Sequence, residues 1–505
     1  MDVIVPMAGH SRRYAAAGWA GPKALLPVDG APMIQRVLEM FAPHDRFHVI
    51  VHDGQLAEDP TLRARLESLG DVVVHSLPPH EDGPVRSVLA VTGLPDDAPV
   101  VVCYCDFLLR WDAEAFYAHW AGAPGAVVTF RGFQPASFGP AMFAHCRVDG
   151  DRMLELREKE CFTADRRSEH ASAGVYAFDS WARLRSLSEQ RLARPRGPLE
   201  CYVSLLLQDL VEDGETVVVH EVPRFACLGT PQDYAQYLAW GDAWGDLAPA
   251  APVGATTTAL IPLAGRGQRF ADAGFTTPKP LIAARGVPMA VRAARSLPAT
   301  RRRFGLRAED EAAVRPPLAE AFPDAEFVVL PGETSGQAAT CLAMLEGVDP
   351  AAPLLIGSGD YEQPVDAERW AALVADESID AAVWTVTPGA GLFAPWTAYA
   401  WCRQEDGRLT ELVEKRTISD DPRQDPLVIG TFWFRRAADF ARGARAMIAA
   451  GITVNGEHYV GTSINQLVAE GLSVAVFEVD RWTCFGTPFE LALHDWWADW
   501  FGADD

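Results

Sequence analysis

Long hydrophobic runs, a basic leader and paired cysteine motifs are all missing from this sequence. Its apolar runs, such as Val100–Cys105, have the length of a strand and fall far short of the roughly 20 residues that span a bilayer. The N-terminus shows no basic segment followed by a long apolar one, so we expect no secretory signal. The 9 cysteines are scattered and form no Cys-x-x-Cys pair, which favours reduced thiols over a disulfide framework or a zinc site. These absences predict a cytoplasmic protein.

Positive charge is also in short supply. The 505 residues include 44 Lys and Arg against 68 Asp and Glu, which gives a formal net charge of −24. Because nucleic acids and anionic membranes repel such a chain, we expect neither as a partner. Lysine is the rarest cation, with only four positions: Lys23, Lys159, Lys279 and Lys415. A compact ammonium fits where a guanidinium fork does not, so these four positions are candidate functional sites.

The four lysines reveal an internal repeat. Lys23 and Lys279 are 256 residues apart, and so are Lys159 and Lys415. Other segments match at almost the same offset: Val5–Gly9 with Ile261–Gly265, Asp106 with Asp360, and Cys227–Pro231 with Cys484–Pro488. A near-constant offset across many matches indicates two copies of one domain. We predict domains at 1–246 and 258–505, joined by a short linker at 247–257 that is rich in Pro, Ala and Thr.

Strand and helix patterns alternate within each copy. Strands are expected at Val3–Pro6, Phe47–Val51, Val72–His75 and Val100–Cys105, and again at Thr258–Pro262, Glu326–Leu330 and Pro353–Ile356. Helices are expected between them, at Met33–Phe41, Leu62–Leu69, Val88–Thr92, Ala290–Leu297 and Ala338–Leu345. This alternation predicts an α/β fold with a largely parallel, doubly wound sheet. Ligands of such sheets bind beyond the carboxyl ends of the strands, where Asp106 and Asp360 fall.

The strongest chemical motif follows the strand Thr258–Pro262. It reads Ala264-Gly-Arg-Gly-Gln-Arg-Phe270, with Pro278-Lys279-Pro-Leu281 behind it. Glycines let the backbone approach a phosphate chain, and successive N–H groups can surround its oxygens. Arg269 and Lys279 would add positive charge against a polyphosphate. An ordinary glycine-rich turn with a solvated lysine is the alternative, and the scarcity of lysine favours the phosphate site.

These motifs resemble the opening signature of the sugar-phosphate nucleotidylyltransferases. Later motifs resemble the same family in the same order: Gly336-Gln337-Ala338, Gly359-Asp360, Val413-Glu-Lys415 and Gly486-Thr-Pro488. The resemblance covers nearly all of both copies. It implies two tandem nucleotide-binding domains of a Rossmann-like, GT-A-like fold with mixed, mostly parallel central sheets. It also implies an enzyme that joins an NTP to a phosphorylated acceptor, such as a sugar 1-phosphate, and releases pyrophosphate with the help of Mg²⁺.

The resemblance assigns roles to residues of copy two. Arg269 and Lys279 would be catalytic on the triphosphate, and Lys415 on the acceptor phosphate. Asp360 would bind Mg²⁺, with a purely structural aspartate as the alternative. Contacts with the nucleotide would come from Ala264, Gly265, Arg266, Gly267, Gly336 and Gln337. Contacts with the acceptor would come from Glu414, Gly430, Glu457 and Tyr459, although Glu414 and Lys415 could also be a surface ion pair.

Copy one keeps most of this set and departs from it in two places. Its catalytic residues would be Arg13, Lys23 and Lys159, its metal ligand Asp106, its nucleotide contacts Ala8 and Gly9, and its acceptor contacts Glu158, Gly174 and Glu200. Ser11 replaces the second glycine of the loop, and Gly83-Pro84 replaces Gly336-Gln337, which removes a side-chain amide and a backbone N–H. Copy one is therefore either a transferase with another nucleotide or acceptor, or a degenerate regulatory copy.

Cysteine occupies a position where the family commonly has a second metal-binding aspartate. The two residues are Cys227 and Cys484, and a thiol is a poor ligand for Mg²⁺. Either one carboxylate with phosphates and waters suffices, or another residue such as Asp480 or Glu457 substitutes. Sequences with this Cys-x-Gly-Thr-Pro ending resemble enzymes of capsule and surface-polysaccharide pathways. We therefore expect the product to be an activated precursor of such a polysaccharide.

Other functions and weaker features stay open. A sensor of nucleotides or sugar phosphates that keeps the fold without turnover would suit the cysteines, whereas the retained Lys, Arg and Asp favour the enzyme. A glycosyltransferase would use Asp-x-Asp, and Asp149-Gly-Asp151, which fits that pattern, is expected to be a hairpin turn. For His145-Cys146 we expect core packing rather than metal binding. The tryptophan-rich tail 491–501 either packs on its own chain or joins a homo-oligomer. Neither the base nor the acceptor follows from the sequence.

Overall fold

The computed structural model describes residues 1–138, 142–195, 200–244, 257–388 and 395–502. The chain forms two compact units, Met1–Leu238 and Ala239–Asp505. The boundary between them falls inside helix α9 (Pro231–Ala243). Apart from its last residue, the predicted linker 247–257 lies outside the described residues. No helix in the described ranges is long and apolar enough to cross a bilayer.

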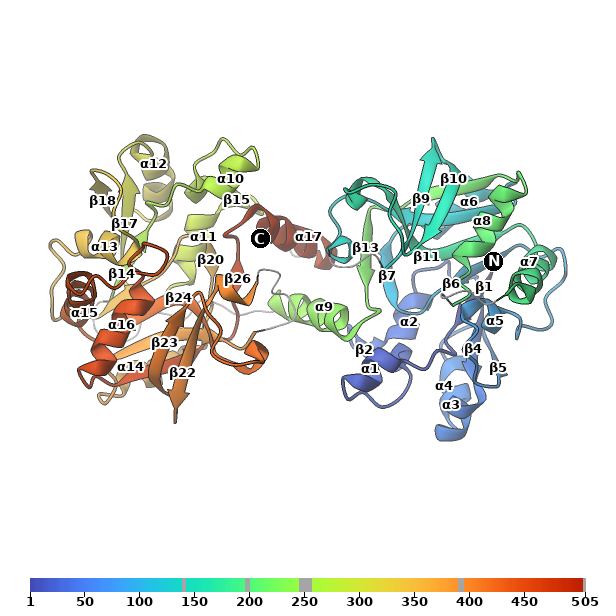
Figure 1. Ribbon diagram of the computed structural model, residues 1–505, viewed down its shortest axis with the longest axis horizontal. Helices are drawn as coiled ribbons and strands as arrows, with labels where there is room; N and C mark the ends of the chain where they lie inside the picture. Colours follow the sequence, from blue (N-terminus) through green and yellow to red (C-terminus); the bar gives the residue numbers. More distant parts are fainter. Residues whose placement is uncertain (139–141, 196–199, 245–256, 389–394, 503–505) are drawn as a thin grey trace. The chain divides into compact units, whose positions relative to one another are not determined.

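Unit 1 is built on a sheet of nine strands in the order β5-β4-β1-β6-β11-β8-β12-β10-β9 (Figure 1). Parallel pairing joins β5, β4, β1 and β6, and also β8 with β12, whereas the other pairings are antiparallel. Strands β9 and β10 form a hairpin whose turn is Asp149–Asp151, as predicted. The bounds are β1 (Asp2–Pro6), β4 (Arg46–His52), β5 (Val72–Leu77), β6 (Val100–Cys103), β8 (Gly125–Phe130), β9 (Ala144–Asp149), β10 (Arg152–Glu158), β11 (His170–Phe178) and β12 (Val217–Glu221).

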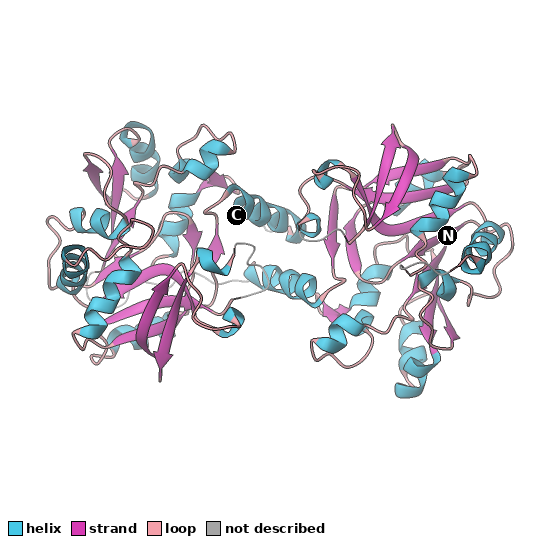
Figure 2. Ribbon diagram, viewed as in Figure 1, coloured by secondary structure: helices cyan, strands magenta, loops and turns pink. Residues whose placement is uncertain are grey.

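Helices lie on the sides of this sheet, and two small ribbons complete the unit (Figure 2). The ribbons pair β2 (Pro27–Val28) with β3 (Ala31–Pro32), and β7 (Phe107–Arg110) with β13 (Arg224–Cys227). The helices before α9 are α1 (Arg12–Ala16), α2 (Met33–Leu38), α3 (Asp53–Glu58), α4 (Leu62–Glu67), α5 (Pro84–Val88), α6 (Ala113–Trp120), α7 (Trp181–Ala193) and α8 (Ser204–Glu212).

Unit 2 repeats this sheet strand for strand, in the order β18-β17-β14-β19-β24-β21-β25-β23-β22. The bounds are β14 (Thr258–Pro262), β17 (Arg301–Arg307), β18 (Glu326–Leu330), β19 (Leu354–Ile356), β21 (Ala381–Val386), β22 (Ala400–Glu405), β23 (Arg408–Glu414), β24 (Leu427–Phe434) and β25 (Val474–Glu478). Its ribbons pair β15 (Ala283–Ala284) with β16 (Val287–Pro288), and β20 (Tyr361–Glu362) with β26 (Thr483–Cys484). Its helices are α10 (Gln268–Asp272), α11 (Met289–Ser296), α12 (Glu311–Ala321), α13 (Gln337–Ala343), α14 (Ala367–Ala375), α15 (Ala437–Ala449), α16 (Val460–Ala469) and α17 (Pro488–Phe501).

The core covers both faces of each sheet. In unit 2, Ala259 and Ile261 of β14 join one buried cluster and Leu260 joins another, because successive side chains of a strand point to opposite faces. The first cluster includes the buried Trp384 and Trp433. Full burial of one large apolar side chain contributes about 1.5–3 kcal/mol, so the two layers fix the strand ends that carry the site.

The predicted fold class is confirmed: both units are α/β with mixed central sheets. The expected element list was wrong at β17, which the sequence analysis did not contain. That strand begins with three arginines, which hid its apolar half from a pattern search. Arg302 and Arg303 turn their guanidinium groups to backbone carbonyls, while Phe304 is fully buried. The helix predicted at Val88–Thr92 lies earlier in the chain, as α5 (Pro84–Val88), which begins after Gly83.

The C-terminal tryptophans are buried within the described chain. Trp496, Trp497 and Trp500 of α17 are at most 3 % exposed. His494 of the same helix lies 5.3 Å from the ring of Trp244. Packing on the chain itself therefore accounts for these side chains.

Candidate active site

A cleft of about 1150 Å³ opens in unit 1 beyond the ends of β1 and β6. It is lined by all nine residues that the sequence analysis assigns to copy one: Ala8, Gly9, Arg13, Lys23, Asp106, Glu158, Lys159, Gly174 and Glu200. They come from the loop after β1, the end of β6, the β10 terminus, β11 and the segment before α8. Because small-molecule sites commonly measure about 300–1,000 Å³, this cleft has room for a nucleotide and a second small molecule.

A lysine–aspartate contact stands at the same place in both units. Lys23 Nζ lies 2.5 Å from Asp106 Oδ2, and Lys279 Nζ lies 2.5 Å from Asp360 Oδ2. Burial opposes the charge of Lys23, yet Asp106 outweighs it and raises the pKa of the ammonium. Burial likewise opposes ionisation of Asp360, but Lys279 holds the pKa of that carboxyl below its ordinary value. Lys23 and Asp360 are therefore charged at neutral pH.

Two further groups support Asp360. The Ser358 hydroxyl donates a 2.5 Å hydrogen bond to Asp360 Oδ1, and the charge of Arg269 also lowers the pKa of Asp360. Burial alone would raise that pKa, so the carboxylate depends on this set of donors and cations. The sequence analysis missed Ser358, which stands two residues before Asp360 and has Tyr104 as its counterpart in copy one.

The glycine-bearing loops have the same backbone shape despite the serine in unit 1. Ser11 has φ 49° and Gly267 has φ 63°, both left-handed. A Cβ on Gly267 would lie 2.9 Å from the Cβ of Lys279, so unit 2 requires glycine there. In unit 1 the Ser11 hydroxyl accepts a 3.1 Å hydrogen bond from the backbone N–H of Lys23. This bond compensates for strain of about 1–2 kcal/mol and keeps the loop beside the lysine.

The side chain of Arg266 is engaged by an acid. Its guanidinium forms an ion pair with Glu333, and both side chains are about two-thirds exposed. The nucleotide contact predicted for the Gly265–Gly267 backbone stays a prediction. The sequence analysis could not foresee this pair because 67 residues separate the two partners.

Gly336 and its counterpart Gly83 are required by a close approach of two backbone segments. A Cβ on Gly336 would lie 2.5 Å from the backbone nitrogen of His458, and one on Gly83 would lie 2.8 Å from that of Cys201. His458 also accepts from Ala338 N–H at 2.9 Å. These contacts place the segments of Glu457 and Glu200 beside the predicted base-binding loops. Packing alone therefore explains both glycines.

The predicted acceptor lysines have a strained backbone. Lys159 and Lys415 both have φ 57°, a conformation that costs a non-glycine residue about 1–3 kcal/mol. Lys159 Nζ donates a 2.6 Å hydrogen bond to the Tyr202 hydroxyl. Lys415 lies over the ring of Tyr459, 5.8 Å from its centre, and donates to the carbonyl of Ala398. Tyr459 is a predicted acceptor contact, and Tyr202 is its counterpart in unit 1.

The glutamates before these lysines differ between the units. Glu158 accepts a 2.5 Å hydrogen bond from Ser204, which opposes the rise in pKa that its burial causes. The counterpart of Ser204 is Gly461, and a Cβ there would lie 2.5 Å from Glu414 Oε1. Without that hydroxyl, burial raises the pKa of Glu414 to about 7, although the charge of Lys415 opposes the rise. Glu414 can therefore exchange a proton near neutral pH.

The remaining predicted acceptor residues lie close to this group. Gly430 has φ 85°, and a Cβ on it would lie 2.9 Å from the hydroxyl of Tyr361, the residue after Asp360. A Cβ on Gly174 would likewise lie 2.9 Å from the ring of Phe107, the residue after Asp106. Burial raises the pKa of Tyr459, and a hydrogen bond with Glu457 raises it further. The structure thus places these glycines against the aromatic residues that follow the two metal-candidate aspartates.

The two cysteines of the Cys-x-Gly-Thr-Pro motifs lie beside the aspartates. A Cβ on Gly486 would lie 3.2 Å from Asp360 Oδ2 and 3.3 Å from Cys484 Sγ. Burial, reinforced by nearby carboxylates, raises the pKa of both Cys484 and Cys227 well above the ordinary value. Each thiol is therefore neutral at physiological pH and is no substitute for a metal-binding carboxylate.

A different carboxylate stands next to each cysteine. The same Cβ on Gly486 would lie 3.5 Å from Glu490 Oε2, and Cys227 Sγ lies 3.5 Å from Asp233 Oδ2. Both acids stand in the first turn of a helix: Thr230 exchanges side-chain and backbone hydrogen bonds with Asp233, and the Thr487 hydroxyl caps α17 by accepting from Glu490 N–H. The sequence analysis missed these acids, although both copies carry one three residues after the threonine.

The two substitutes named from the sequence are engaged elsewhere. Asp480 accepts hydrogen bonds of 2.6 Å from Arg369 and from the backbone N–H of Asp366. The side chain of Glu457 is hydrogen-bonded to that of Tyr459. Glu490 in unit 2 and Asp233 in unit 1 are further carboxylates, and they lie beside the cysteines. A metal-binding role for Asp480 or Glu457 stays a prediction.

Solved structures that match about half of this chain share little sequence with it. The nucleoside-diphosphate-sugar pyrophosphorylase of Vibrio cholerae RC9 is 20% identical over 47% of this chain and 99% of its own, with a TM-score of 0.39. The inositol-1-phosphate CTP transferase of T. maritima is 13% identical over 48% and 96%, with a TM-score of 0.38. A UDP-glucose pyrophosphorylase complexed with UDP-glucose is 15% identical over 47% and 96%, with a TM-score of 0.38.

Comparison with sequence families reaches unit 1. No curated protein matches the chain. Residues 3–168, which run from β1 to the end of the loop after β10, match the family described as the MobA-like NTP transferase domain. The chain therefore carries a nucleotidyltransferase domain.

Proposed function

We propose that this protein is a nucleotidylyltransferase that joins an NTP to a small phosphorylated acceptor, such as a sugar 1-phosphate, and releases pyrophosphate. The observation that carries the proposal is the lysine–aspartate contact of 2.5 Å beside a glycine- or serine-bearing loop, present in both units. The NTP transferase match over 3–168 supports the nucleotide half of the reaction. The product would be an activated precursor of a surface polysaccharide.

The reaction needs positioning more than covalent chemistry. An oxygen of the acceptor phosphate attacks the α-phosphorus of the NTP, the bond from that phosphorus to the bridging oxygen breaks, and pyrophosphate leaves with its electron pair. In unit 2, Lys279 and Arg269 would hold the triphosphate and Lys415 the acceptor phosphate. Fixed cations lower the barrier because they already lie where they can neutralise the negative charge of the reacting phosphates.

Mg²⁺ fits the donor set beside Lys279. Asp360 and Glu490 offer the carboxylate oxygens that this ion prefers, and both face the position of Gly486. When bound, the ion would neutralise phosphate oxygens as a Lewis acid. Lys279 is suited to release Asp360 and contact a phosphate, because its ammonium sits on a flexible stem and needs no fixed geometry. Asp106 and Asp233 would serve unit 1 in the same way.

The acceptor sites of the two units would differ in polarity. Ser204 already occupies one hydrogen-bonding position of Glu158, whereas Glu414 has no hydroxyl in that place because its neighbour is Gly461. Glu414 would therefore bind a hydroxyl or amine of the acceptor, while Lys415 binds its phosphate. This difference supports two acceptors or two nucleotides for one chain.

A sensor of nucleotides without turnover is the second candidate. The neutral thiols of Cys227 and Cys484 favour it, because they remove a carboxylate from the place where the metal would bind. The charged pair of Lys279 and Asp360 opposes it, since tight binding alone does not require an aspartate beside the phosphate-binding lysine. The two candidates predict different outcomes in one assay.

Pyrophosphate release by the full chain tests the proposal. ATP, CTP, GTP and UTP would each be combined with sugar 1-phosphates and with small phosphorylated alcohols and amines, in the presence of Mg²⁺. Lys279→Ala, Lys23→Ala and the double variant would run beside Arg442→Ala, which removes ion pairs with Glu470 and Asp439 outside the predicted site. Release that survives in Arg442→Ala and is lost in the double variant supports the enzyme. Nucleotide binding by calorimetry without release from any pair would support the sensor instead.

A further inference from the structure

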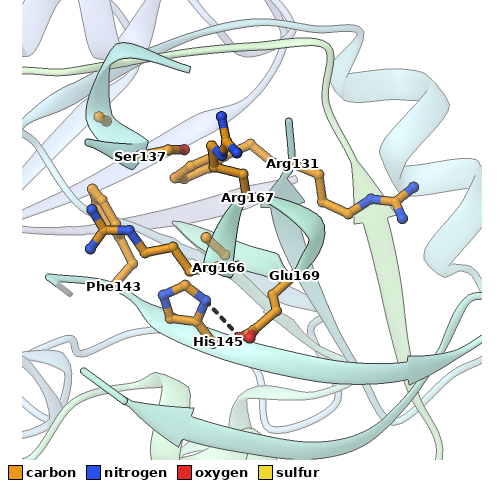
Figure 3. Close-up of a pocket in the computed structure, with 10 residues that line it drawn as sticks. Arg131, Ser137, Phe143, His145, Arg166, Arg167 and Glu169 are labelled. Carbon is orange, nitrogen blue, oxygen red and sulfur yellow. Dashed lines mark ion pairs between the residues drawn. The ribbon is translucent and has the colours of Figure 1, made fainter. Parts of the chain in front are cut away.

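Three side chains with metal-binding atoms, none of which lines the cleft, converge in unit 1. They are His145 of β9, Cys161 in the loop after β10, and Glu169 just before β11, and their ligand atoms all lie within 4.8 Å of one another. Cys161 Sγ lies 3.5 Å from His145 Nε2, and His145 Nδ1 lies 3.3 Å from Glu169 Oε2. Figure 3 shows His145 and Glu169 facing each other beside a small cavity.

The histidine is buried without being satisfied. Its side chain is 3% exposed, and Nδ1 makes no hydrogen bond of regular geometry among the described residues, although Glu169 is near. Burial lowers the pKa of His145 despite the carboxylate, so the imidazole is neutral. A neutral imidazole has a free lone pair, which is the form that binds metal ions.

The carboxylate is held in place by its own loop. Glu169 Oε1 accepts from the Thr163 hydroxyl at 2.6 Å and from the Thr163 backbone N–H at 2.5 Å, and Oε2 accepts from Phe162 N–H at 3.0 Å. Carboxylates that ligate metals are commonly fixed by such outer hydrogen bonds. Glu169 thus presents an oxygen to His145 without needing to reorganise.

The spacing suits a tetrahedral ion. With Zn–N and Zn–O both near 2.0 Å, a tetrahedral site separates nitrogen from oxygen by about 3.3 Å. That is the distance from His145 Nδ1, the unpartnered ring nitrogen, to Glu169 Oε2. The three ligand atoms lie within 4.8 Å of one another, so Cys161 can supply the sulfur. The adjoining cavity, lined by His145 and Glu169, measures about 10 Å³. It has the size of one water molecule, which would supply a fourth ligand.

Unit 2 provides an internal comparison. At the same offset of 256 residues, Thr163 and Glu169 have the counterparts Ser419 and Asp425, which form the same side-chain hydrogen bond at 2.5 Å. The hydrogen bond between hydroxyl and carboxylate in this loop is therefore common to both units. His145 and Cys161, in contrast, have Trp401 and Thr417 as counterparts, neither of which binds metal. The hydrogen bond that both units share accounts for Glu169, but it does not account for His145 and Cys161.

We propose that His145, Cys161 and Glu169 bind one divalent ion of the borderline-soft class, with Zn²⁺ as the best match, and that water completes the site. Cys161 binds as the thiolate and releases its proton to solvent, while Arg166, which lines the cavity, adds compensating positive charge. A sulfur–nitrogen–oxygen set suits Zn²⁺ and does not suit Mg²⁺. The scattered cysteines favoured the absence of a zinc site. No short motif marks these three ligands, because they are 8 to 24 residues apart in the sequence.

Such an ion would act on the neighbouring cleft. Cys161 follows Lys159 by two residues, so the ion would tie the segment after Lys159 to β9. Because Lys159 already has a strained backbone, a fixed segment behind it would help to hold its ammonium against Tyr202. The site would thus be a structural support for unit 1 alone.

Cobalt binding by the full, metal-stripped chain tests this site. Co²⁺ alone is the probe, because a tetrahedral cobalt thiolate gives a charge-transfer band in the near ultraviolet and d–d bands in the visible region. We expect one thiolate-bound Co²⁺ per chain, displaced by one equivalent of Zn²⁺. Cys161→Ser should abolish the charge-transfer band, and His145→Gln should weaken binding at least tenfold. Cys146→Ser, which changes a buried thiol of the same strand, is the matched control and should keep the bands.

Two results would overturn the proposal. One is the absence of a cobalt–thiolate band in the unaltered chain. The other is a band that survives Cys161→Ser and disappears in Cys227→Ser, which would place the ion beside Asp106. Hydrogen exchange of residues 159–169 gives an independent readout that needs no cysteine variant. Zn²⁺ should slow exchange of these residues in the unaltered chain and should not change their exchange in His145→Gln. Equal exchange with and without Zn²⁺ in the unaltered chain would count against the site.

Discussion

Replacement of Glu414 by glutamine should stabilise unit 2 at alkaline pH. The carboxyl of Glu414 is buried beside Gly461, and its pKa is raised to about 7 from an ordinary value of 4.5. Glu414 therefore binds its proton more tightly in the folded chain than in the unfolded chain. Its contribution to stability is fully present below pH 4.5 and is lost as the pH rises towards 7. Glutamine imitates the neutral acid and does not ionise.

The expected size follows from the pKa difference. Each pH unit between the two pKa values changes the free energy of unfolding by about 1.4 kcal/mol, so ionised Glu414 costs unit 2 about 3 kcal/mol above pH 7. Glu414→Gln should be close to the unaltered chain in stability at pH 5. Between pH 5 and pH 8 it should gain about 2–3 kcal/mol relative to that chain.

Amide hydrogen exchange resolves this effect, because it reports on β23 and α16 separately from unit 1. Exchange would be followed at pH 5, 6.5 and 8 in denaturant-free buffer, after correction for the intrinsic pH dependence of exchange. Glu158→Gln is the matched control in unit 1, where Ser204 and Lys159 favour the charged form, so its gain with pH should be smaller. A difference between Glu414→Gln and the unaltered chain that stays constant from pH 5 to pH 8 would refute the reasoning.

Three further predictions follow from the site. Lys279→Ala should lower kcat/KM of the unit 2 reaction about 10²–10³-fold, measured with Lys23→Ala as background, because a fixed cation is lost; an unchanged rate would remove Lys279 from the triphosphate site. Gly336→Ala should destabilise unit 2 by about 1–3 kcal/mol in urea unfolding through its contact with His458, whereas Gly332→Ala, which meets open space, should not. Cys484→Asp should lower the Mg²⁺ concentration for half-maximal activity, and a higher requirement would contradict a metal site at this position.

The sequence predicted the repeated architecture because its signals are local. A lysine that arginine cannot replace, a glycine loop after an apolar strand and an aspartate at a strand end each depend on a few neighbouring residues. Their order along the chain, taken together with strand–helix alternation, was enough to assign these residues to one site in each copy. The contacts of Lys23 with Asp106 and of Lys279 with Asp360 came from the structure. Residue roles at these positions stay predictions until activity is measured.

The close neighbours of some predicted residues were not visible in the sequence. Gly336 and Gly430 stay predicted ligand contacts, and the structure adds that a neighbouring group leaves no space for a Cβ on either. Ser11 looked like a broken loop, yet its hydroxyl restores the tie to Lys23. The strand β17 was missed because its arginines turn to distant carbonyls, which no local pattern encodes.

By itself, the sequence predicted two α/β copies that each carry the same set of Lys, Arg and Asp residues at their strand ends, because periodicity and spacing are properties of the chain. Only the tertiary structure decided which acid stands beside Cys484, why Glu414 is less acidic than Glu158, and that His145, Cys161 and Glu169 meet. These outcomes depend on strand order and on burial, which bring together residues far apart in sequence and set the dielectric around each charge.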